Sequence, residues 1–156
     1  MMLNKPKFWD KKIGLISIVL LPLSFIYYLV IIFKKKFTKR IKFETPIICI
    51  GNIYIGGSGK TPTSILLANE LKKIGKKPAI IRKYYENHTD EYNLIKNYFK
   101  NLITNNDRVS GLLEAENNGY NILILDDGLQ DYRIKKNLSI VCFNQKQLIG
   151  NGLVLP

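Results

Sequence analysis

The sequence predicts an α/β fold in which helices flank a parallel sheet, preceded by an N-terminal membrane helix. Short apolar runs alternate with segments of helical spacing, which is typical of a parallel sheet. A glycine-rich stretch follows one apolar run, and a pair of acidic residues ends another. An uninterrupted apolar run near the N-terminus precedes this arrangement.

The first segment, residues 1–42, is expected to anchor the chain to a membrane. No charge interrupts the 21 residues from Ile13 to Phe33, IGLISIVLLPLSFIYYLVIIF, and a bilayer-spanning helix needs roughly 20. A cleaved signal peptide normally has a shorter apolar core, and a buried core helix normally has polar positions along one face. The pattern fits either a helix that spans the bilayer or a helix that lies in its interface. The basic cluster that follows, KKKFTKR, predicts that the rest of the chain is cytoplasmic.

The charge distribution argues against a nucleic-acid partner. The formal net charge is +12, but residues 1–42 hold ten Lys or Arg and one acidic residue, whereas residues 43–156 hold fourteen and eleven. A nucleic-acid-binding domain needs its basic face on the folded part, while a basic N-terminus suits contact with anionic lipid. Cys49 and Cys142 lack metal-ligand spacing, so we expect two buried free thiols in a reducing compartment.

Residues 43–156 are expected to form one domain. Strands are predicted at residues 46–50, 78–81, 121–125 and 138–143. One helix is predicted over 61–74, a second is capped by Thr89 and continues through Leu102, and a short third ends near Gly119. The inner face of the first helix is expected to consist of Ile65, Leu66, Ala68, Leu71 and Ile74.

The stretch GNIYIGGSGKTPT, residues 51–63, has the composition of a phosphate-binding loop. Such a loop needs glycines so that backbone N–H groups can point inward, and a helix N-terminus behind it favours negative charge. It also needs a lysine for the outer phosphates and a hydroxyl for Mg²⁺. These roles are filled in order by Gly56, Gly57, Gly59, Lys60 and Thr61. The usual first glycine, six places before the lysine, is Tyr54 here.

The run NILILDDG places Asp126 and Asp127 at the end of a predicted strand. Acidic residues in this position hold Mg²⁺ directly or through water in nucleotide-binding proteins that use such a loop. Ligands of parallel sheets bind at the carboxyl ends of the strands, where the loop and the acidic pair both lie. The domain is therefore predicted to be P-loop NTPase-like and to bind a nucleotide with Mg²⁺.

Three segments, TPIICIGNIYIGGSGKTP, LDDGLQDYR and GNGLVLP, follow the apolar helix and together resemble the tetraacyldisaccharide 4'-kinase family. The resemblance covers nearly all of the chain. It implies transfer of the γ-phosphate of ATP to the 4'-hydroxyl of a tetraacyldisaccharide 1-phosphate, which forms the 1,4'-bisphosphate in lipid A biosynthesis. It also implies a lipid disaccharide acceptor and a cytoplasmic domain at the bacterial inner membrane. No protein partner is evident.

The resemblance implies roles for individual residues. Asp90 matches the catalytic acid of the family, which helps to activate the sugar hydroxyl, and Lys60 and Asp127 act with it in the transfer. Nucleotide contacts are implied for Tyr54, Ile55, Gly56, Gly57, Ser58, Gly59, Lys60, Thr61, Arg108 and Gln130. Contacts with Mg²⁺ are implied for Thr61, Asp126 and Asp127.

The chain departs from the family pattern in several places. The Ser-Arg-Gly-Tyr-Gly of the family appears as IRKYY, residues 81–85, and Asp131 replaces the usual histidine after Gln130. The family continues beyond the position of Pro156, so the C-terminal half of its fold, with the histidine that partners the catalytic aspartate, is expected to be missing. His88 is expected to be a surface-loop residue rather than a substitute for that partner.

Two other functions fit the same features. One is a membrane-tethered ATP-binding remnant without transfer activity. The other is a different P-loop ATPase, against which the membrane segment and the DDGLQ stretch argue.

Overall fold

The computed structural model describes residues 15–52, 58–143 and 145, and the chain divides into two compact units. The first unit contains helix α1, Leu15–Phe37, which includes Pro22 and carries three lysines in its last turn. The second unit, Lys39–Cys142, contains the remaining helices and strands. The site described below belongs to this second unit.

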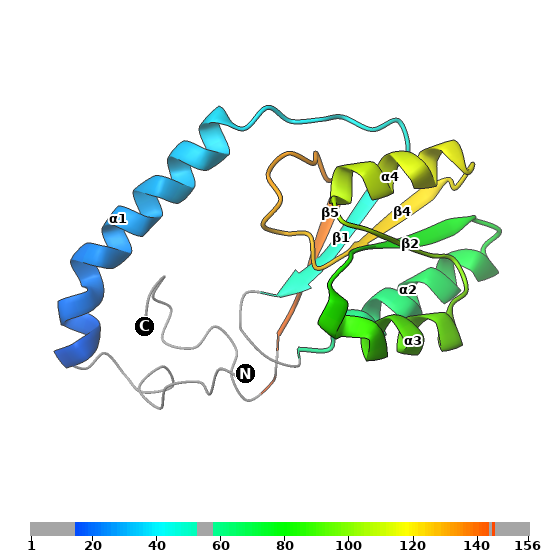
Figure 1. Cartoon of the computed structure of the whole chain (residues 1–156), viewed down its shortest axis with the longest axis horizontal. Coiled ribbons are helices and arrows are strands. Elements are labelled where there is room, and N and C mark those ends of the chain that lie inside the picture. Colours follow the sequence, from blue (N-terminus) through cyan, green and yellow to red (C-terminus); the bar gives the residue numbers. More distant parts are fainter. Residues whose placement is uncertain (1–14, 53–57, 144, 146–156) are drawn as a thin grey trace. The chain divides into compact units, whose positions relative to one another are not determined.

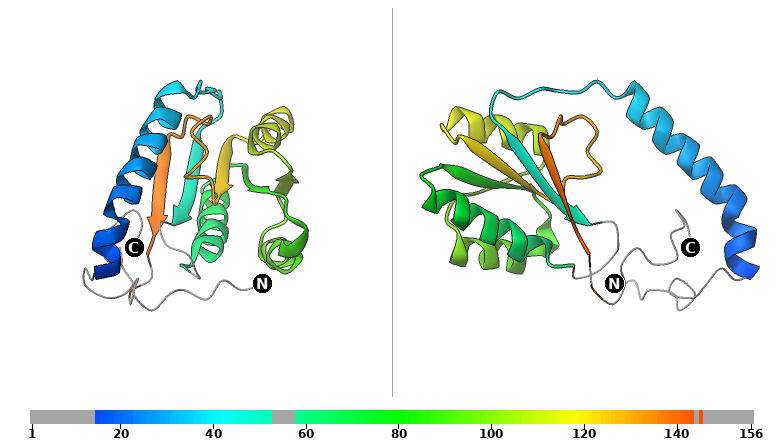
Figure 2. Two further views of the ribbon diagram at one scale, coloured as in Figure 1. Left: turned by 60° about the vertical axis from the view of Figure 1, so that its left-hand side comes forward. Right: turned by 180° about the vertical axis from the view of Figure 1, so that it is seen from behind.

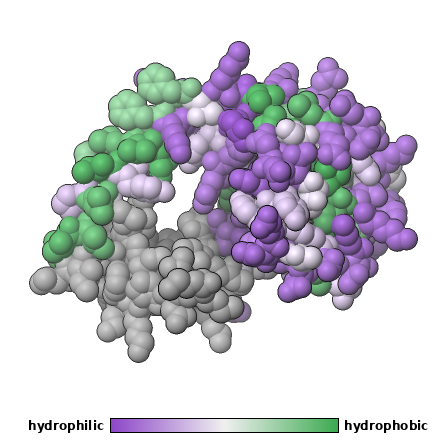
Figure 3. Space-filling view, in the orientation of Figure 1, coloured by the Kyte–Doolittle hydropathy of each residue, from purple (hydrophilic) through white to green (hydrophobic). Residues whose placement is uncertain are grey.

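Helix α1 is long and apolar enough, by length and composition, to cross a membrane over Ile18–Phe37. The mean hydropathy of its most apolar window is 1.9, and only 6% of that window is buried. Figure 3 shows the hydrophobic side chains of this helix at the surface. A core helix or a signal sequence can also meet the length and composition criteria, but a core helix would be mostly buried.

The second unit is built on a five-stranded sheet in the order β3-β2-β4-β1-β5 (Figure 1), with all neighbours parallel. The register places Cys49 between Leu125 and Ser139, and Ile80 between Leu102 and Ile124. The strands are β1 (Ile47–Asn52), β2 (Pro78–Lys83), β3 (Leu102–Asn105), β4 (Ile122–Asp126) and β5 (Leu138–Cys142). The predicted parallel α/β fold is confirmed.

Helices cover both faces of the sheet, with α4 on one side and α2 and α3 on the other, as Figures 1 and 2 show. Successive strand residues point to opposite faces, so the core divides into two clusters. Ile81 and Leu125 pack with Leu112 of α4, whereas Ile80 and Ile124 pack with Ala68 of α2. The helices are α2 (Lys60–Lys73), α3 (Thr89–Tyr98) and α4 (Arg108–Asn117), and a 3₁₀ turn, η2 (Glu86–His88), precedes α3.

Strand β3 was not predicted, because Leu102 continues the apolar spacing of the preceding helix. In the structure α3 ends at Tyr98, Phe99 is extended, and β3 forms the edge of the sheet beside β2. The predicted cap at Thr89 is also wrong. The N-cap residue is His88, and the Thr89 hydroxyl instead donates a hydrogen bond to the Glu86 carbonyl oxygen at 3.2 Å.

The predicted inner face of the first helix is only partly correct. Ala68 is buried and Ile65 and Leu71 are partly buried, but Leu66 is 62% exposed and Ile74 is 69% exposed. Ser64, which was not expected on the inner face, is fully buried. This position matters for the site, because its hydroxyl reaches an acidic residue at the end of β4.

The two cysteines differ in burial. Cys49 is buried in β1 and Cys142 is half-buried in β5, so the expectation of a buried thiol is wrong for Cys142. Both are free thiols, as predicted. Burial raises the pKa of the Cys49 thiol above its usual value, which keeps that side chain neutral and unreactive.

Candidate functional site

The carboxyl ends of β1, β2 and β4 bring polar side chains together beside the first turn of α2. Asn52 ends β1, Arg82 lies near the end of β2, and Asp126 ends β4. Because β4 pairs with both β1 and β2, these three ends are neighbours in the sheet. The site therefore lies where ligands of parallel sheets bind.

Lys60, the first residue of α2, connects the glycine-rich loop to the acidic pair. Its Nζ donates a hydrogen bond to Asn52 Oδ1 at 2.9 Å and lies 3.2 Å from Asp127 Oδ1. The lysine side chain is largely shielded from solvent, whereas half of the Asp127 side chain is exposed. The structure thus brings Lys60 and Asp127 together, as the sequence predicted.

Asp126 is buried, with 1% of its surface exposed, and three side chains surround its carboxylate. Ser64 donates to Oδ1 at 3.1 Å, and Thr61 and Arg82 donate to Oδ2 at 3.3 and 3.0 Å. Burial raises the pKa of Asp126 above its usual value, and the positive charge of Arg82 opposes this shift.

Asp127 adopts a left-handed backbone conformation, with φ of 62°, which is uncommon for a residue other than glycine. Two hydrogen bonds to its backbone hold Asp127 in this conformation. Its N–H donates to the Ile50 carbonyl oxygen at 2.8 Å, and its own carbonyl oxygen accepts a hydrogen bond from Arg108 at 2.7 Å. This conformation turns the Asp127 side chain out of the strand direction and toward Lys60.

The start of α2 has the features of an anion-binding helix terminus. The N-cap residue Gly59 has φ of 79°, a conformation that favours glycine, and no side chain caps the helix. The first turn contains no acidic residue. Such a terminus presents free N–H groups and a positive dipole end. The four predicted contact residues Tyr54, Ile55, Gly56 and Gly57 lie outside the described residues.

Within the described residues, two buried polar atoms near the ends of this site have no hydrogen-bond partner. They are Ser58 Oγ, in the glycine-rich loop, and Arg108 Nε, in the first turn of α4. Buried polar groups are nearly always paired in native proteins, so both atoms are suited to receive a polar ligand. Both belong to the set of residues that the sequence predicted to contact a nucleotide.

Three other residues considered in the sequence analysis lie outside the cluster around Lys60 and Asp126. Asp90 is exposed in the first turn of α3, next to Glu91, whose carboxylate pairs with Arg82. Gln130 is exposed on the segment that follows β4. His88 belongs to η2, its side chain is 41% exposed, and its Nδ1 lies 3.5 Å from Glu91 Oε2, which fits the expected surface residue.

The donor set fits Mg²⁺ rather than a metal that needs several imidazole or thiolate ligands. Within the described part of the chain, no group of three or more His, Cys, Asp or Glu residues could hold a metal. Thr61 Oγ1 and Asp126 Oδ2, however, are 3.3 Å apart, and adjacent oxygen ligands of an octahedral Mg²⁺ lie about 2.9 Å apart. Mg²⁺ commonly takes one or two protein oxygens and completes its shell with phosphate and water.

Sequence reasoning missed Arg82, Ser64 and Asn52 as members of the site. Arg82 directly follows the buried run AII at the carboxyl end of β2, and Ser64 lies one turn after Lys60 on α2. A charged residue that ends a buried strand was the signal available for Arg82. No comparable signal existed for Ser64, because it lies within a run of helix residues that looks amphipathic without it.

The chain resembles known proteins over nearly its whole length. Residues 16–156 match the family model described as "Tetraacyldisaccharide-1-P 4'-kinase". A tetraacyldisaccharide 4'-kinase of Pelagibacter ubique is 46% identical over all of this chain and 49% of its own length. One from Nitrobacter hamburgensis is 28% identical over 99% of this chain and 50% of its own length.

A solved structure shares the fold. The crystal structure of LpxK from Aquifex aeolicus in complex with ATP aligns with a TM-score of 0.67 and 29% sequence identity. The alignment covers 82% of this chain and 49% of that one. The chain thus spans about half the length of the relatives that it matches.

Proposed function

Because the chain belongs to the tetraacyldisaccharide 4'-kinase family, we propose that it carries the ATP-binding half of a lipid kinase. The reaction is transfer of the γ-phosphate of ATP to the 4'-hydroxyl of a tetraacyldisaccharide 1-phosphate, which yields the 1,4'-bisphosphate in lipid A biosynthesis. The observation that carries this proposal is the meeting of the glycine-rich loop with the acidic pair, through Lys60 and Asp127 at 3.2 Å.

The phosphates of ATP would lie at the N-terminus of α2. Residues 54–61 would supply backbone N–H groups, and the lysine of this segment would contact the outer phosphates. Support comes from the free helix terminus at Gly59 and from the unpaired buried hydroxyl of Ser58. Arg108 and Gln130 would complete the nucleotide contacts, and Arg108 has an unpaired Nε available.

Thr61, Asp126 and Asp127 would hold Mg²⁺. Their oxygens are the ligand type that Mg²⁺ prefers, and the first two are already in contact. When bound, Mg²⁺ neutralises phosphate charge and orients the transferring group. The chain itself would position these oxygens through Ser64, whose buried hydroxyl fixes the second oxygen of Asp126.

Asp90 would accept the proton of the attacking sugar hydroxyl. Its place in the first turn of α3, exposed to solvent, leaves it accessible to an acceptor. Its neighbour Glu91 pairs with Arg82, and Arg82 contacts Asp126, so the start of α3 is connected to the metal-binding oxygens. Phosphoryl transfer depends mainly on such positioning and on neutralising charge.

Helix α1 would bring the domain to its lipid acceptor. An apolar helix with a basic end suits insertion into a membrane with an anionic surface. We place the protein at the bacterial inner membrane with residues 43–156 on the cytoplasmic face, where ATP is present. Exposed apolar side chains along α1 support this arrangement.

Nucleotide binding tests the proposal most directly. Purified chain should bind ATP in the presence of Mg²⁺, and Lys60→Ala should abolish measurable binding because it removes the phosphate-contacting ammonium group. Lys73→Ala is the matched control, since that lysine is exposed on the same helix and forms a salt bridge with the exposed Glu70. Unchanged ATP affinity in Lys60→Ala would refute the cradle assignment.

A transfer assay separates the proposal from its nearest rival. Radiolabelled γ-phosphate should appear on a tetraacyldisaccharide 1-phosphate acceptor presented in detergent micelles. ATP binding without any transfer would favour the rival function, a membrane-tethered ATP-binding remnant without transfer activity.

A further inference from the structure

Arg82 lies in the site, but the proposed reaction gives its guanidinium no contact with ATP or the acceptor. Its NH1 donates to Asp126 Oδ2 at 3.0 Å and to Thr61 Oγ1 at 3.2 Å. Its NH2 pairs with Glu91 Oε2 at the start of α3. The two oxygens that NH1 contacts belong to Thr61 and Asp126, two of the three residues that would hold Mg²⁺.

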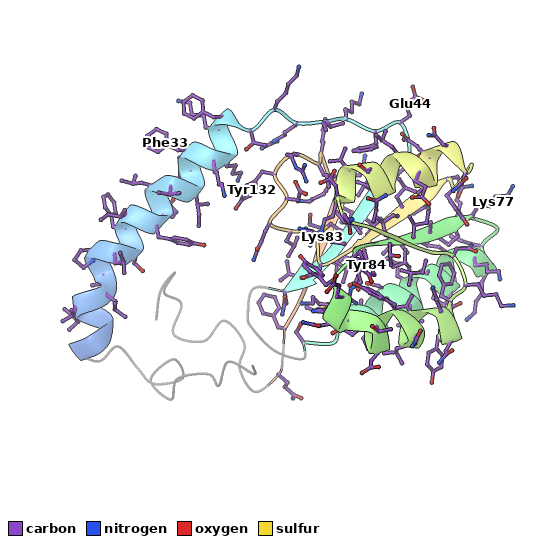
Figure 4. All side chains as sticks on the ribbon, viewed as in Figure 1. Phe33, Glu44, Lys77, Lys83, Tyr84 and Tyr132 are labelled. Carbon is purple, nitrogen blue, oxygen red and sulfur yellow. The ribbon has the colours of Figure 1, made fainter. Side chains whose placement is uncertain are left out.

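Arg82 is buried, and its guanidinium is held by contacts on several sides. The residue is 7% exposed and its guanidinium lies 5.7 Å from the centre of the Tyr92 ring, within cation–π range. Its strand neighbour Lys83 points elsewhere, with its ammonium group over the Tyr85 ring at 5.3 Å. Figure 4 shows Lys83 and Tyr84 where β2 ends, close to η2. Of these two neighbouring basic residues of β2, Arg82 therefore points into the site, toward Asp126.

Arg82 and a divalent cation cannot both hold Thr61 Oγ1 and Asp126 Oδ2 at close range. The oxygens lie 3.3 Å apart, so a guanidinium nitrogen and an Mg²⁺ that share both of them would lie within roughly 4 Å of each other. Two positive charges at that distance repel strongly in a buried site. The guanidinium thus supplies at these two oxygens the positive charge that a divalent cation would supply there.

We propose that Arg82 is a counter-ion switch, which neutralises Asp126 in the metal-free chain and leaves it when a divalent cation enters. This inference rests on the proposed function. Glu91 remains as the partner of the displaced guanidinium, because NH2 already contacts it. When the guanidinium leaves Asp126, its remaining contact is with Glu91 in the first turn of α3, next to Asp90. Arg82 is therefore a positioning residue that couples metal occupancy to the helix that carries the proposed base.

Measuring cation binding in the absence of nucleotide tests whether Arg82 and a divalent cation compete for Asp126. The full chain in detergent micelles is titrated with Mn²⁺ alone, and bound Mn²⁺ is measured by electron paramagnetic resonance. Arg82→Met should bind Mn²⁺ more tightly by roughly tenfold, in the range typical of coupled equilibria. Lys83→Met is the matched control, because it removes the same charge one residue away, and its affinity should change much less. Equal or weaker binding by Arg82→Met would overturn the inference.

A second measurement uses the unmodified sequence, because Arg82→Met leaves a buried carboxylate with one partner fewer and could fail to fold. The chain has four arginines, so ¹⁵N-arginine labelling gives a short list of guanidinium signals, and Arg82→Lys assigns one of them. Adding Mg²⁺ with a non-hydrolysable ATP analogue should shift the Arg82 signal and leave that of Arg133 unchanged. The analogue alone, with a chelator present, should shift the Arg82 signal less.

The outcomes separate the inference from the proposed function. An Arg82 signal that stays unchanged while the analogue and Mg²⁺ bind would overturn the switch and leave the ATP-binding proposal intact. Failure of both the analogue and the cation to bind would overturn the proposed function, and the switch with it.

Discussion

At the scale of single residues, the carboxylate of Asp126 is buried and needs compensating interactions. A buried charge is costly unless hydrogen bonds and an opposite charge compensate it. Here Ser64 serves one oxygen, while Thr61 and Arg82 serve the other. The carboxylate is therefore held in one orientation, which suits the proposed role of Asp126 in holding Mg²⁺.

Ser64→Ala tests how far this arrangement depends on one hydroxyl. The change removes a hydrogen bond to a buried charged group, which should lower the free energy of unfolding by about 1–3 kcal/mol. Ser110→Ala is the control, because it makes the same substitution at an exposed position of helix α4, where changes stay within about 0.5 kcal/mol. Urea unfolding measures both. Equal effects in the two variants would contradict the role assigned to Ser64.

Gly51, in β1, meets a second local constraint. A Cβ added at this position would lie 2.5 Å from Leu129 Cγ and 2.6 Å from its Cδ1, so the leucine must move. Leu129 belongs to the segment that follows the acidic pair, and close packing here fixes that segment against β1. The space at Gly51 is needed for packing, whereas Gly59 is needed for its positive φ.

Gly51→Ala should therefore reduce stability by about 1–3 kcal/mol, the usual cost of overpacking. The matched test is a double-mutant cycle with Leu129→Ala, which removes the obstructing atoms. The cost of Gly51→Ala should be smaller in the Leu129→Ala background than in the original chain, as measured by thermal unfolding. Strictly additive costs would show that the leucine is not the obstacle.

At the scale of elements, the N-terminus of α4 fastens the segment that follows β4. Asp107 caps the helix by accepting a hydrogen bond from the Ser110 N–H at 3.3 Å, and Arg108 donates to the Asp127 carbonyl oxygen. Arg133 then contacts both Asp107 and Asp131, each at 2.7 Å. Asp131, the departure from the family pattern, thus forms part of a bridge between two elements beside the site.

The Arg133 bridge predicts a change of stability at acid pH. Hydrogen bonds from Arg133 lower the pKa values of Asp107 and Asp131 below their usual range. A lowered folded-state pKa stabilises the fold above the unfolded-state pKa, which is about 4 for Asp, and the contribution disappears as pH falls below it. Arg133→Met should therefore cost up to about 1 kcal/mol near pH 7, since the pairs are partly exposed, and less at pH 2–3.

Chemical denaturation across this pH range measures the Arg133 effect. Lys135→Met is the control, because it removes one exposed positive charge from the same segment. Its effect on the unfolding free energy should be small and nearly independent of pH. A stability difference between Arg133→Met and the original chain that persists undiminished at pH 2–3 would contradict the bridge.

The sequence predicted the elements whose signals are local. The glycine-rich loop between β1 and α2 and the acids at the end of β4 were expected to meet, and Lys60 does contact Asp127. Strand β3 was missed because its four residues follow a helix without a break in apolar spacing. The exposed side of α2 was misjudged because packing, not the helix alone, decides that Ser64 faces β4 while Leu66 faces solvent.

Arg82 could not be placed from sequence for a different reason. Its partners Thr61, Glu91 and Asp126 come from α2, α3 and β4, and only the strand order β2-β4-β1 brings them together. A sequence pattern predicts which residue types are present, but convergence of this kind depends on topology. The predicted contacts of Tyr54, Gln130 and Asp90 with ligands stay predictions.

At the scale of the whole molecule, apolar surface and charge are segregated along the chain. Residues 1–42 hold ten of the 24 Lys and Arg residues, and α1 exposes large apolar side chains such as Val19, Phe25 and Phe33. The unit Lys39–Cys142 has its own core on both faces of the sheet. We therefore expect the proposed membrane attachment and the proposed nucleotide binding to belong to different segments, which a deletion can separate.

The full chain should pellet with membranes and resist extraction by high salt and by alkaline carbonate, because burial of the α1 side chains does not depend on charge. Deleting residues 1–38 should release the remainder into the supernatant, and it keeps Ile41, whose backbone bonds to Arg133 and Lys135 hold the start of the domain. Replacing Lys34, Lys35 and Lys36 by serine is the control: it removes the basic end of α1 and leaves its apolar surface, so pelleting should persist. Release of the full chain by salt alone would show that α1 adheres by charge, and a full chain that never pellets would refute the anchor.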